Sequence, residues 1–295
     1  MENKKIAVIG AGNMGTALIR GLVKAKWCSP ERVMATLPRD EKAEALAKEF
    51  KIKTSTDNAK AAGWADVVIL AVKPQILPSV MKEISGEINK EKLIVSIAAG
   101  VTTQTIEDAF GKVPVIRTMP NVATTVELGA TALCAGRYAH DDHKEMARSI
   151  FEAVGMVVEV PENLMDAVTG LSGTGPMYIF QIIEGLSDAG VKVGMSRHIA
   201  SSLAIQTVLG AAKMAQTMKK HPAELKDLVT SPGGTAITAL HSLERNRLRA
   251  ILMDAVEAAT NRSRELGQLN ETAGRDAAEA TRKPAGFRGE KTTTT

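Results

Sequence analysis

The hydrophobic and polar positions along this chain divide it into two halves with different periodicity. Up to residue 160, short aliphatic runs alternate with segments that carry a helical pattern of apolar residues. Alternation of this kind predicts a mostly parallel, doubly wound sheet wrapped by helices. The predicted strands span residues 6–9, 32–36, 66–72, 93–97, 113–118, 130–134 and 156–160.

Past Pro161 the strand pattern stops, and the chain has a helical pattern to about residue 269. Pro176 and Pro222 fit the first positions of helices, which proline favours. Residues 199–215 are apolar or small nearly all round, which indicates a helix buried on every side and hence an obligate oligomer. The predicted helices span residues 165–171, 176–189, 197–218, 222–230, 235–246 and 248–266.

Three parts follow from these patterns. Residues 1–161 are expected to form a Rossmann-type α/β domain, and residues 162–269 an all-α helical domain for dimerisation and substrate binding. Residues 270–295 mix Ala, Gly, charged residues and a final Thr run without either period. This last segment is therefore predicted to be a disordered tail.

The first aliphatic run leads directly into Gly10-Ala11-Gly12-Asn13-Met14-Gly15 and then into an apolar helix. In a G-x-G-x-x-G turn, the first glycine permits the tight turn, the second lets the backbone approach a pyrophosphate, and the third allows close helix packing. The helix N-terminus then offers free N–H groups to phosphate. This context predicts a dinucleotide site; the plainer alternative is a glycine-rich turn without a ligand.

The end of the second strand bears on the choice of cofactor. An NAD site normally has Asp or Glu about 20 residues after the glycine turn, but here the chain reads Thr36-Leu37-Pro38-Arg39. Thr36 and Arg39 suit a 2′-phosphate, so NADPH is preferred over NADH, which stays possible. The alternative for Arg39 is a solvated charge at a helix start.

Further cofactor contacts are expected where other strands end, because ligands gather at that edge of a doubly wound sheet. Asn58 lies at the start of a predicted helix. Val72-Lys73-Pro74 lies at the end of the predicted strand 66–72, and Ala99 follows the predicted strand 93–97. Small residues there would let a nicotinamide lie against the backbone. Lys73 could equally be an ordinary surface lysine, since lysine is mostly exposed.

Two glycine-containing segments in the helical half, 171–176 and 230–235, place Ser, Thr and Gly directly before predicted helices. Such segments present N–H and hydroxyl donors to an anion such as a carboxylate, although plain N-capping is the alternative for each. Gly170, Gly173 and Gly175 match the glycines of the G-x-x-G-x-G-x-x-x-K-x-x-N motif, in which 3-hydroxyacid dehydrogenases carry a catalytic lysine and asparagine. Ile179 and Ile182 stand at those two positions, so the base for alcohol oxidation is absent. A cyclic imine needs no strong base to accept a hydride.

Composition excludes several other classes. The chain has 295 residues, of which 44% are hydrophobic, 24% charged and 3% aromatic, as in a globular protein. The net charge of +4 and the pI near 9.0 suit an anionic small ligand. Basic residues are spread along the chain rather than clustered, which disfavours nucleic acid as a partner. No apolar run reaches the roughly 20 residues of a membrane-spanning helix.

Cysteine and histidine give no sign of a metal. Cys28 and Cys134 are far apart and outside any C-x-x-C pair, so neither a disulfide nor a metal site is expected. His140 and His143 flank two aspartates, a pattern more typical of a solvated helix start than of ligands. With charge at residues 1–5 and no cleavage site, no signal peptide is expected, which favours the cytoplasm.

Taken together, several motifs resemble pyrroline-5-carboxylate reductases, in order and over about residues 5 to 268. They comprise the glycine turn, 71–75 (A-V-K-P-Q), 117–121 (R-T-M-P-N), 166–173 (D-A-V-T-G-L-S-G), 228–235 (L-V-T-S-P-G-G-T) and 254–259 (D-A-V-E-A-A). The resemblance implies NADPH- or NADH-dependent reduction of 1-pyrroline-5-carboxylate to L-proline, the last step of proline biosynthesis. It also implies a Rossmann domain and an interlocking helical homodimer, with decamers common in the family.

The resemblance and the residue patterns together give two sets of expected site residues. The cofactor set is Gly10, Ala11, Gly12, Asn13, Met14, Thr36, Leu37, Arg39, Asn58, Val72, Lys73, Pro74 and Ala99. The substrate set is Met119, Pro120, Asn121, Glu162, Ser231, Gly233, Gly234, Thr235 and Ala236, with Thr235 and Ser231 as the catalytic candidates.

One departure from the family pattern concerns the hydroxyl near the imine. Family loops usually carry Thr at the second position after S-P-G-G, where this chain has Ala236. Thr235 could supply the hydroxyl from a shifted position, or water could protonate the nitrogen. Two alternatives stay open: a reductase of another cyclic imine, such as a six-membered piperideine carboxylate, and a non-catalytic NADP(H)-binding sensor.

Overall fold

Eight strands form one sheet in the computed structural model, which describes residues 4–282, with side chains to residue 269. The strand order is β3-β2-β1-β4-β5-β6-β7-β8, and all neighbours are parallel except β6 and β7. The expected mostly parallel sheet is confirmed. The strands are β1 Ile6–Ile9, β2 Val33–Thr36, β3 Lys53–Ser55, β4 Val67–Leu70, β5 Leu93–Ser96, β6 Val115–Met119, β7 Gly129–Ala135 and β8 Gly155–Glu159.

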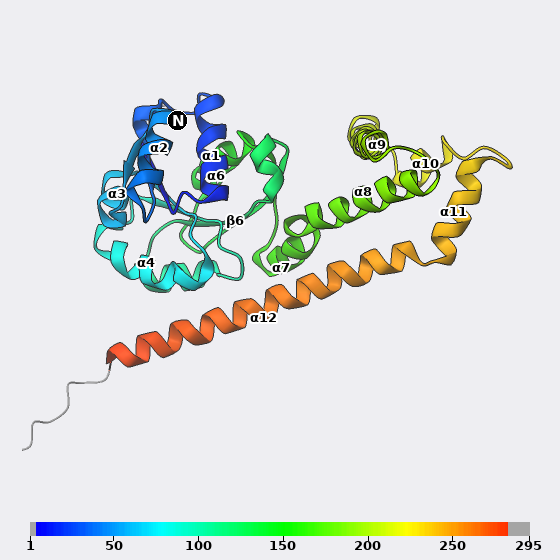
Figure 1. Ribbon diagram of the computed structural model, residues 1–295. Coiled ribbons are helices and arrows are strands. Elements are labelled where there is room, and N and C mark those ends of the chain that lie inside the picture. Colours follow the sequence, from blue (N-terminus) through cyan, green and yellow to red (C-terminus); the bar gives the residue numbers. More distant parts are fainter. Residues whose placement is uncertain (1–3, 283–295) are drawn as a thin grey trace, which may run out of the picture.

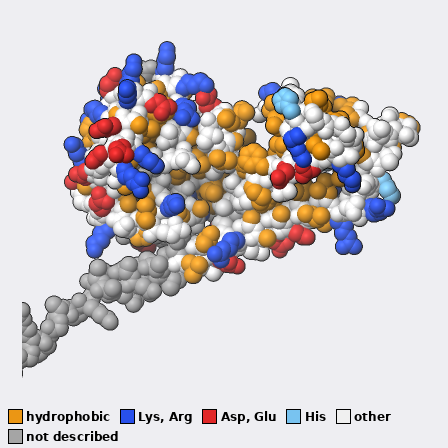
Figure 2. All heavy atoms as spheres, viewed as in Figure 1, with side chains coloured by type: hydrophobic (Ala, Val, Ile, Leu, Met, Phe, Trp, Pro, Cys, Tyr) orange, Lys and Arg blue, Asp and Glu red, His pale blue; other side chains and the backbone are white. Residues whose placement is uncertain are grey.

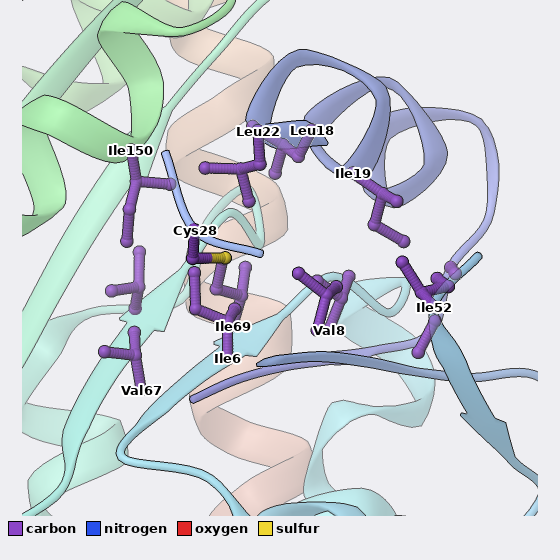
Figure 3. Packing of buried hydrophobic residues seen from close by; sticks show 14 of the residues in the cluster. Ile6, Val8, Leu18, Ile19, Leu22, Cys28, Ile52, Val67, Ile69 and Ile150 are labelled. Carbon is purple, nitrogen blue, oxygen red and sulfur yellow. The ribbon is translucent and has the colours of Figure 1, made fainter. Parts of the chain in front are cut away.

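Helices cover both faces of this sheet. Residues from α1, α2 and α6 pack on one face, and residues from α3, α4 and α5 pack on the other. Figure 3 shows Leu18, Ile19 and Leu22 of α1 lying over Ile6 and Val8 of β1. The helices are α1 Asn13–Lys24, α2 Asp40–Phe50, α3 Asn58–Trp64, α4 Leu77–Ile84, α5 Thr103–Phe110 and α6 Asp141–Glu152.

This packing fixes the orientation of helix α1 on the sheet. Leu18, Ile19 and Leu22 are completely buried, as are Ile6 and Val8 below them. Fully burying one aliphatic side chain contributes about 1.5–3 kcal/mol, so the orientation of α1 is strongly determined. Its N-terminus is thereby held at the carboxyl end of β1, beside the switch point where β1 lies between β2 and β4.

The second half is helical, as predicted, and projects away from the sheet (Figure 1). Here α8 leads outward, α10 and α11 lie at the far end, and α12 returns, so that a Cβ on Gly267 would lie 3.4 Å from the Gly100 carbonyl oxygen. The helices are α7 Met165–Val168, α8 Gly175–Lys192, α9 Arg197–Met218, α10 Pro222–Asp227, α11 Thr235–Arg245 and α12 Leu248–Arg282.

The end of this half differs from the prediction. Helix α12 continues to Arg282, so the expected disordered tail from residue 270 is wrong for residues 270–282; residues 283–295 lie outside the described part. The segment 271–282 contains four alanines together with glutamate and arginine, which are good helix formers. Extending an existing helix also avoids the cost of nucleation.

Helix α9 carries apolar side chains that its own chain leaves uncovered. Ile199, Leu203 and Ile205 are each 53% exposed, whereas only Ala200 and Ala204 of this helix are buried. Figure 2 shows hydrophobic side chains spread over this half, while charged side chains are more frequent on the visible face of the sheet domain. Exposed apolar surface of this extent marks an association surface.

Candidate active site

The glycine turn has the geometry of a phosphate cradle. Gly10 has a φ of +87°, and a Cβ there would collide with the side chain of Val72. A Cβ on Gly15 would lie 3.0 Å from the Gly10 carbonyl oxygen, so both positions require glycine. Gly12, by contrast, has open space where its Cβ would stand. The backbone at Gly12 is therefore accessible to a ligand.

The N-terminus of α1 fits an anion. Its N-cap is Gly12, no side chain caps it, and its first turn contains no acidic residue. Asn13 and Met14 begin the helix there, so free N–H groups and the positive end of the helix dipole face the same opening. These features fit the pyrophosphate of a dinucleotide.

Thr36 lies at the carboxyl end of β2, where the sequence suggested it, and contacts the glycine turn. It is 2% exposed, and its Oγ1 accepts a hydrogen bond from the Gly10 N–H at 3.0 Å, while the Thr36 carbonyl accepts one from Ala11 at 2.8 Å. Thr36 therefore helps to fix the glycine turn, while its hydroxyl hydrogen stays free to donate, so the expected contact with a 2′-phosphate stays a prediction. A hydroxyl at the end of a buried strand points into the adjacent turn as readily as into solvent.

Arg39 is left as the cation at this end of β2. It is exposed and directly precedes α2 as its N-cap residue. Asn58 begins α3, and its Nδ2 donates to Glu83 Oε2 at 2.9 Å. The guanidinium of Arg39 is thus available to a 2′-phosphate, whereas the amide of Asn58 is already oriented by α4.

The ends of β4 and β5 complete this side of the site. Val72 packs against the glycine turn, Lys73 is exposed, and Pro74 begins the short helix η2 Pro74–Ile76. Ala99 is half-buried after β5. The structure thus brings these residues to the same sheet edge as Gly10, as the sequence predicted.

The residues after β6 form the next wall. Met119 is half-buried and Pro120 is buried. Asn121 Nδ2 donates to the Ser172 carbonyl at 3.1 Å, and its Oδ1 accepts hydrogen bonds from Ala123 and Ala130 at 3.2 Å. Asn121 therefore links the sheet domain to the helical half, and its side chain is occupied in doing so.

The first glycine-containing segment of the helical half is not a loop. Residues Thr169–Gly173 form a π-helix, η6, that joins α7 to α8. The hydroxyls of Thr169, Ser172 and Thr174 donate to carbonyls of the preceding turn, at 2.9, 3.3 and 3.0 Å. They are therefore not free to bind an anion, and the expected open donor loop at 171–176 is wrong.

Glu162 is likewise engaged. Its Oε1 accepts from Thr103 N at 2.8 Å and from Arg117 Nη1 at 3.2 Å, and its Oε2 accepts from Thr103 Oγ1 at 2.6 Å. No sequence pattern pointed to Thr103, and Arg117 stood out only as the first residue of the 117–121 motif. The signal for Arg117 was available, since a charged residue within an aliphatic strand run must find a partner when buried.

The second glycine-containing loop is open. Ser231, Gly233 and Thr235 are exposed, and Gly233 has a φ of +68°. Gly234 is the N-cap of α11, and no side chain caps this helix. Within the part of the chain that the structure describes, the hydroxyls of Ser231 and Thr235 make no hydrogen bond. This loop therefore presents N–H and hydroxyl donors outward.

This loop does not lie near the glycine turn of its own chain. It connects α10 and α11 at the far end of the helical half, away from the sheet (Figure 1). One chain therefore holds the two halves of the candidate site, Gly10–Ala99 and Ser231–Ala236, apart. Sequence position alone could not indicate this, because it depends on the direction in which α8 leaves the sheet.

The remaining candidates for chemistry are inert. Cys28 and Cys134 are free and buried, and burial raises the pKa of the Cys134 thiol to about 12. His140 and His143 form a capping box at the start of α6, as expected for a helix start. Over residues 4–269 no cluster of side chains suits a metal ion, and no helix of the described part is long and apolar enough to cross a membrane.

Comparison with known proteins agrees with this architecture. Residues 162–266 match the family of pyrroline-5-carboxylate reductase dimerisation domains, and residues 5–100 match the coenzyme F420-dependent NADP oxidoreductase family. The pyrroline-5-carboxylate reductase of Methanosarcina acetivorans is 50% identical over 269 residues, which cover 91% of this chain and 100% of that protein.

Solved structures give the same result. A pyrroline-5-carboxylate reductase from Coxiella burnetii has a TM-score of 0.85 and 38% identity, covering 89% of this chain and 98% of that one. Plasmodium falciparum pyrroline carboxylate reductase with NADP bound has a TM-score of 0.82 and 33% identity, covering 90% and 99%. The chain belongs to the pyrroline-5-carboxylate reductase family.

Proposed function

We propose that the protein reduces 1-pyrroline-5-carboxylate to L-proline with NADPH. The observation that supports this proposal is that one chain contains both an open, uncapped glycine turn and an outward-facing S-P-G-G loop. That chain is 50% identical to a named pyrroline-5-carboxylate reductase. No strong base is needed, because the protonated imine carbon is already electrophilic.

The cofactor side is assigned to the first half of the chain. Gly12, Asn13 and Met14 would hold the pyrophosphate at the N-terminus of α1, and Ala99 would lie against the nicotinamide. When bound, NADPH supplies the hydride. Arg39 would neutralise the 2′-phosphate, and the absence of a carboxylate from residues 34–39 leaves no acceptor for a free 2′-hydroxyl. We therefore infer a preference for NADPH over NADH.

The substrate side is assigned to the S-P-G-G loop of a second protomer. Within one chain the loop lies far from the turn, yet α9 leaves Ile199, Leu203 and Ile205 exposed for a partner to cover. A homodimer through the helical half would bring one protomer's loop to the other's cofactor. Further assembly, such as a decamer, and a cytoplasmic location are predictions on the family resemblance.

At that loop, the donors have distinct tasks. The N–H of Gly233 and the hydroxyl of Ser231 would bind the substrate carboxylate, and the N-terminus of α11 adds a favourable dipole. The Gly234 N–H already donates to the Ser231 carbonyl at 3.1 Å, so Gly234 shapes the loop instead. Thr235 has the hydroxyl closest in sequence to the position where relatives usually carry Thr, which is Ala236 here. Thr235 would therefore keep the ring nitrogen protonated, directly or through water.

The test is NADPH oxidation, followed at 340 nm on adding 1-pyrroline-5-carboxylate to the purified dimer, with proline measured as the product and NADH run in parallel. We expect NADPH loss and proline formation in equal amounts, with NADH poorer. A Gly12→Val variant, which fills the open space above the turn, should lose activity and NADPH binding together. Tight NADPH binding without substrate-dependent oxidation would contradict the proposal and favour a sensor.

A further inference from the structure

Glu162, the first residue of the helical half, is fastened to two segments of the sheet domain. Its carboxylate accepts three hydrogen bonds, from the backbone N–H and the hydroxyl of Thr103 and from the guanidinium of Arg117. All three are 3.2 Å or shorter, and hydrogen bonds to a charged group are the stronger kind. This carboxylate therefore has little capacity left for a ligand.

The partners of Glu162 are deeply buried. Thr103 and Arg117 are each 5% exposed, and the Arg117 side chain forms an ion pair with Glu162 at 3.2 Å. The carboxylate also lies at the N-terminus of α5, because Thr103 is the first residue of that helix. The positive end of the helix dipole and the guanidinium both attract this carboxylate. We call this partly buried contact of Glu162 with Thr103 and Arg117 the joint; it is not a surface ion pair.

This joint connects three segments that carry the proposed site. Thr103, the first residue of α5, follows Ala99 closely in the sequence. Arg117 lies on β6 two residues before Met119. Glu162 begins η5 Glu162–Leu164, which leads through α7 into the π-helix that contacts Met119 and Asn121. The carboxylate of Glu162 therefore links the Ala99 segment, proposed to lie beside the nicotinamide, with the Met119 segment, proposed to lie beside the substrate. Glu162 itself begins the helical half.

We propose that Thr103 and Arg117 are positioning residues for hydride transfer and that they act through Glu162. The inference rests on the proposed reductase function, and it replaces the expectation that Glu162 itself lines the substrate pocket. Its physical basis is that hydride transfer needs the reacting atoms at about 3–3.5 Å, so a shift of the Ala99 segment against Met119 by a fraction of an ångström lowers the rate of the chemical step.

The main test is Thr103→Val, which keeps the shape of the side chain but removes the hydroxyl that donates to Glu162. We expect kcat to fall about tenfold while KM for 1-pyrroline-5-carboxylate changes less than about twofold. The isotope effect with NADPH deuterated at the transferred position should rise, because the chemical step becomes more rate-limiting. The matched variant Thr103→Ser keeps the hydroxyl and should recover most of kcat.

Glu162→Gln provides a second, independent change. It removes the negative charge of the Glu162 ion pair with Arg117, so it should reproduce the lowered kcat and the raised isotope effect of Thr103→Val. Equal kcat and isotope effect in Thr103→Val and the wild type would overturn the proposal. So would a Thr103→Ser variant as impaired as Thr103→Val, since that result indicates packing rather than the hydrogen bond.

Failure of the reductase function would be recognised separately. In that case the wild type itself would not oxidise NADPH with 1-pyrroline-5-carboxylate. The joint is then judged on NADPH affinity, measured by quenching of protein fluorescence. A dissociation constant about threefold higher in Thr103→Val, restored in Thr103→Ser, supports the joint as the support of the Ala99 segment, and an unchanged value overturns it.

Discussion

Thr36 Oγ1 lies 3.0 Å from the backbone nitrogen of Gly10 and accepts its hydrogen. The contact joins the end of β2 to the first glycine of the turn, across 26 residues of sequence. Gly10 directly follows β1, which ends at Ile9, and its N–H bonds to this hydroxyl rather than to a strand carbonyl. The hydroxyl of Thr36 therefore fixes the shape of the turn.

Thr36→Val should loosen that turn without creating a cavity. The half-buried Gly10 N–H would lose its acceptor, which costs about 0.5–1.5 kcal/mol of unfolding free energy. We expect this loss in urea denaturation, together with a severalfold weaker affinity for NADPH. Thr36→Ser keeps the hydroxyl and is the control, so equal weakening in both variants would argue against the hydrogen bond.

Arg39 should decide between the two cofactors. Arg39→Ala removes the one cation that follows β2 before α2, so KM for NADPH should rise about tenfold, while KM for NADH stays within about twofold. Steady-state kinetics with each cofactor measure this. Lys42→Ala, a neighbouring exposed lysine on α2, is the matched control; a similar change there would indicate a general charge effect rather than contact with the 2′-phosphate.

Ala236→Thr should raise turnover. It places a second hydroxyl beside Thr235 at the first turn of α11, where it would help to protonate the ring nitrogen. We expect kcat to rise by up to roughly tenfold. The complementary change Thr235→Ala should lower kcat in the wild type and have less effect in the Ala236→Thr background. Unchanged or lower turnover in Ala236→Thr would count against this account of proton supply.

The raised pKa of the Cys134 thiol should make the stability of the fold depend on pH. Burial raises its pKa to about 12 and the nearby Glu162 carboxylate acts in the same direction, so the folded state keeps its proton after the unfolded chain, with an ordinary value of 9.0, has released it. Stability is therefore expected to fall as pH rises above 9, by at most about 1.4 kcal/mol per pH unit. Urea denaturation at pH 8 and pH 10 should reveal this difference, which should shrink in Cys134→Ala.

Helix α9 should carry the dimer. Leu203→Glu places a charge on a side chain that is 53% exposed in the single chain and that a partner would bury. We expect the dimer dissociation constant to rise at least about 100-fold and activity to fall with it. Analytical ultracentrifugation measures the assembly. Lys48→Glu on α2, an exposed site outside the helical half, should leave the dimer intact.

The central strands of the sheet could be predicted because they are buried on both faces. Runs such as Val67–Leu70 are aliphatic throughout and stand out from their surroundings. Strand β3, Lys53–Ser55, was missed because it is a three-residue polar edge strand that is recognised only by its pairing with β2. Short edge strands have no periodic pattern of their own.

The candidate site could be predicted only in part. The glycine turn is encoded locally, so its residues lie where the motif indicated. The π-helix at Thr169–Gly173 and the joint at Glu162 depend on contacts between distant segments, with Asn121, Thr103 and Arg117. A spacing rule within one segment carries no information about such partners.

The separation of the glycine turn from the S-P-G-G loop has a genetic consequence. If each complete site takes its turn from one protomer and its loop from the other, two chains damaged at different ends can complement each other. A protomer with a blocked turn and one with a destroyed loop, when mixed, would form hybrid dimers in which one of the two sites is intact. Two defective alleles expressed together would then sustain growth that neither sustains alone.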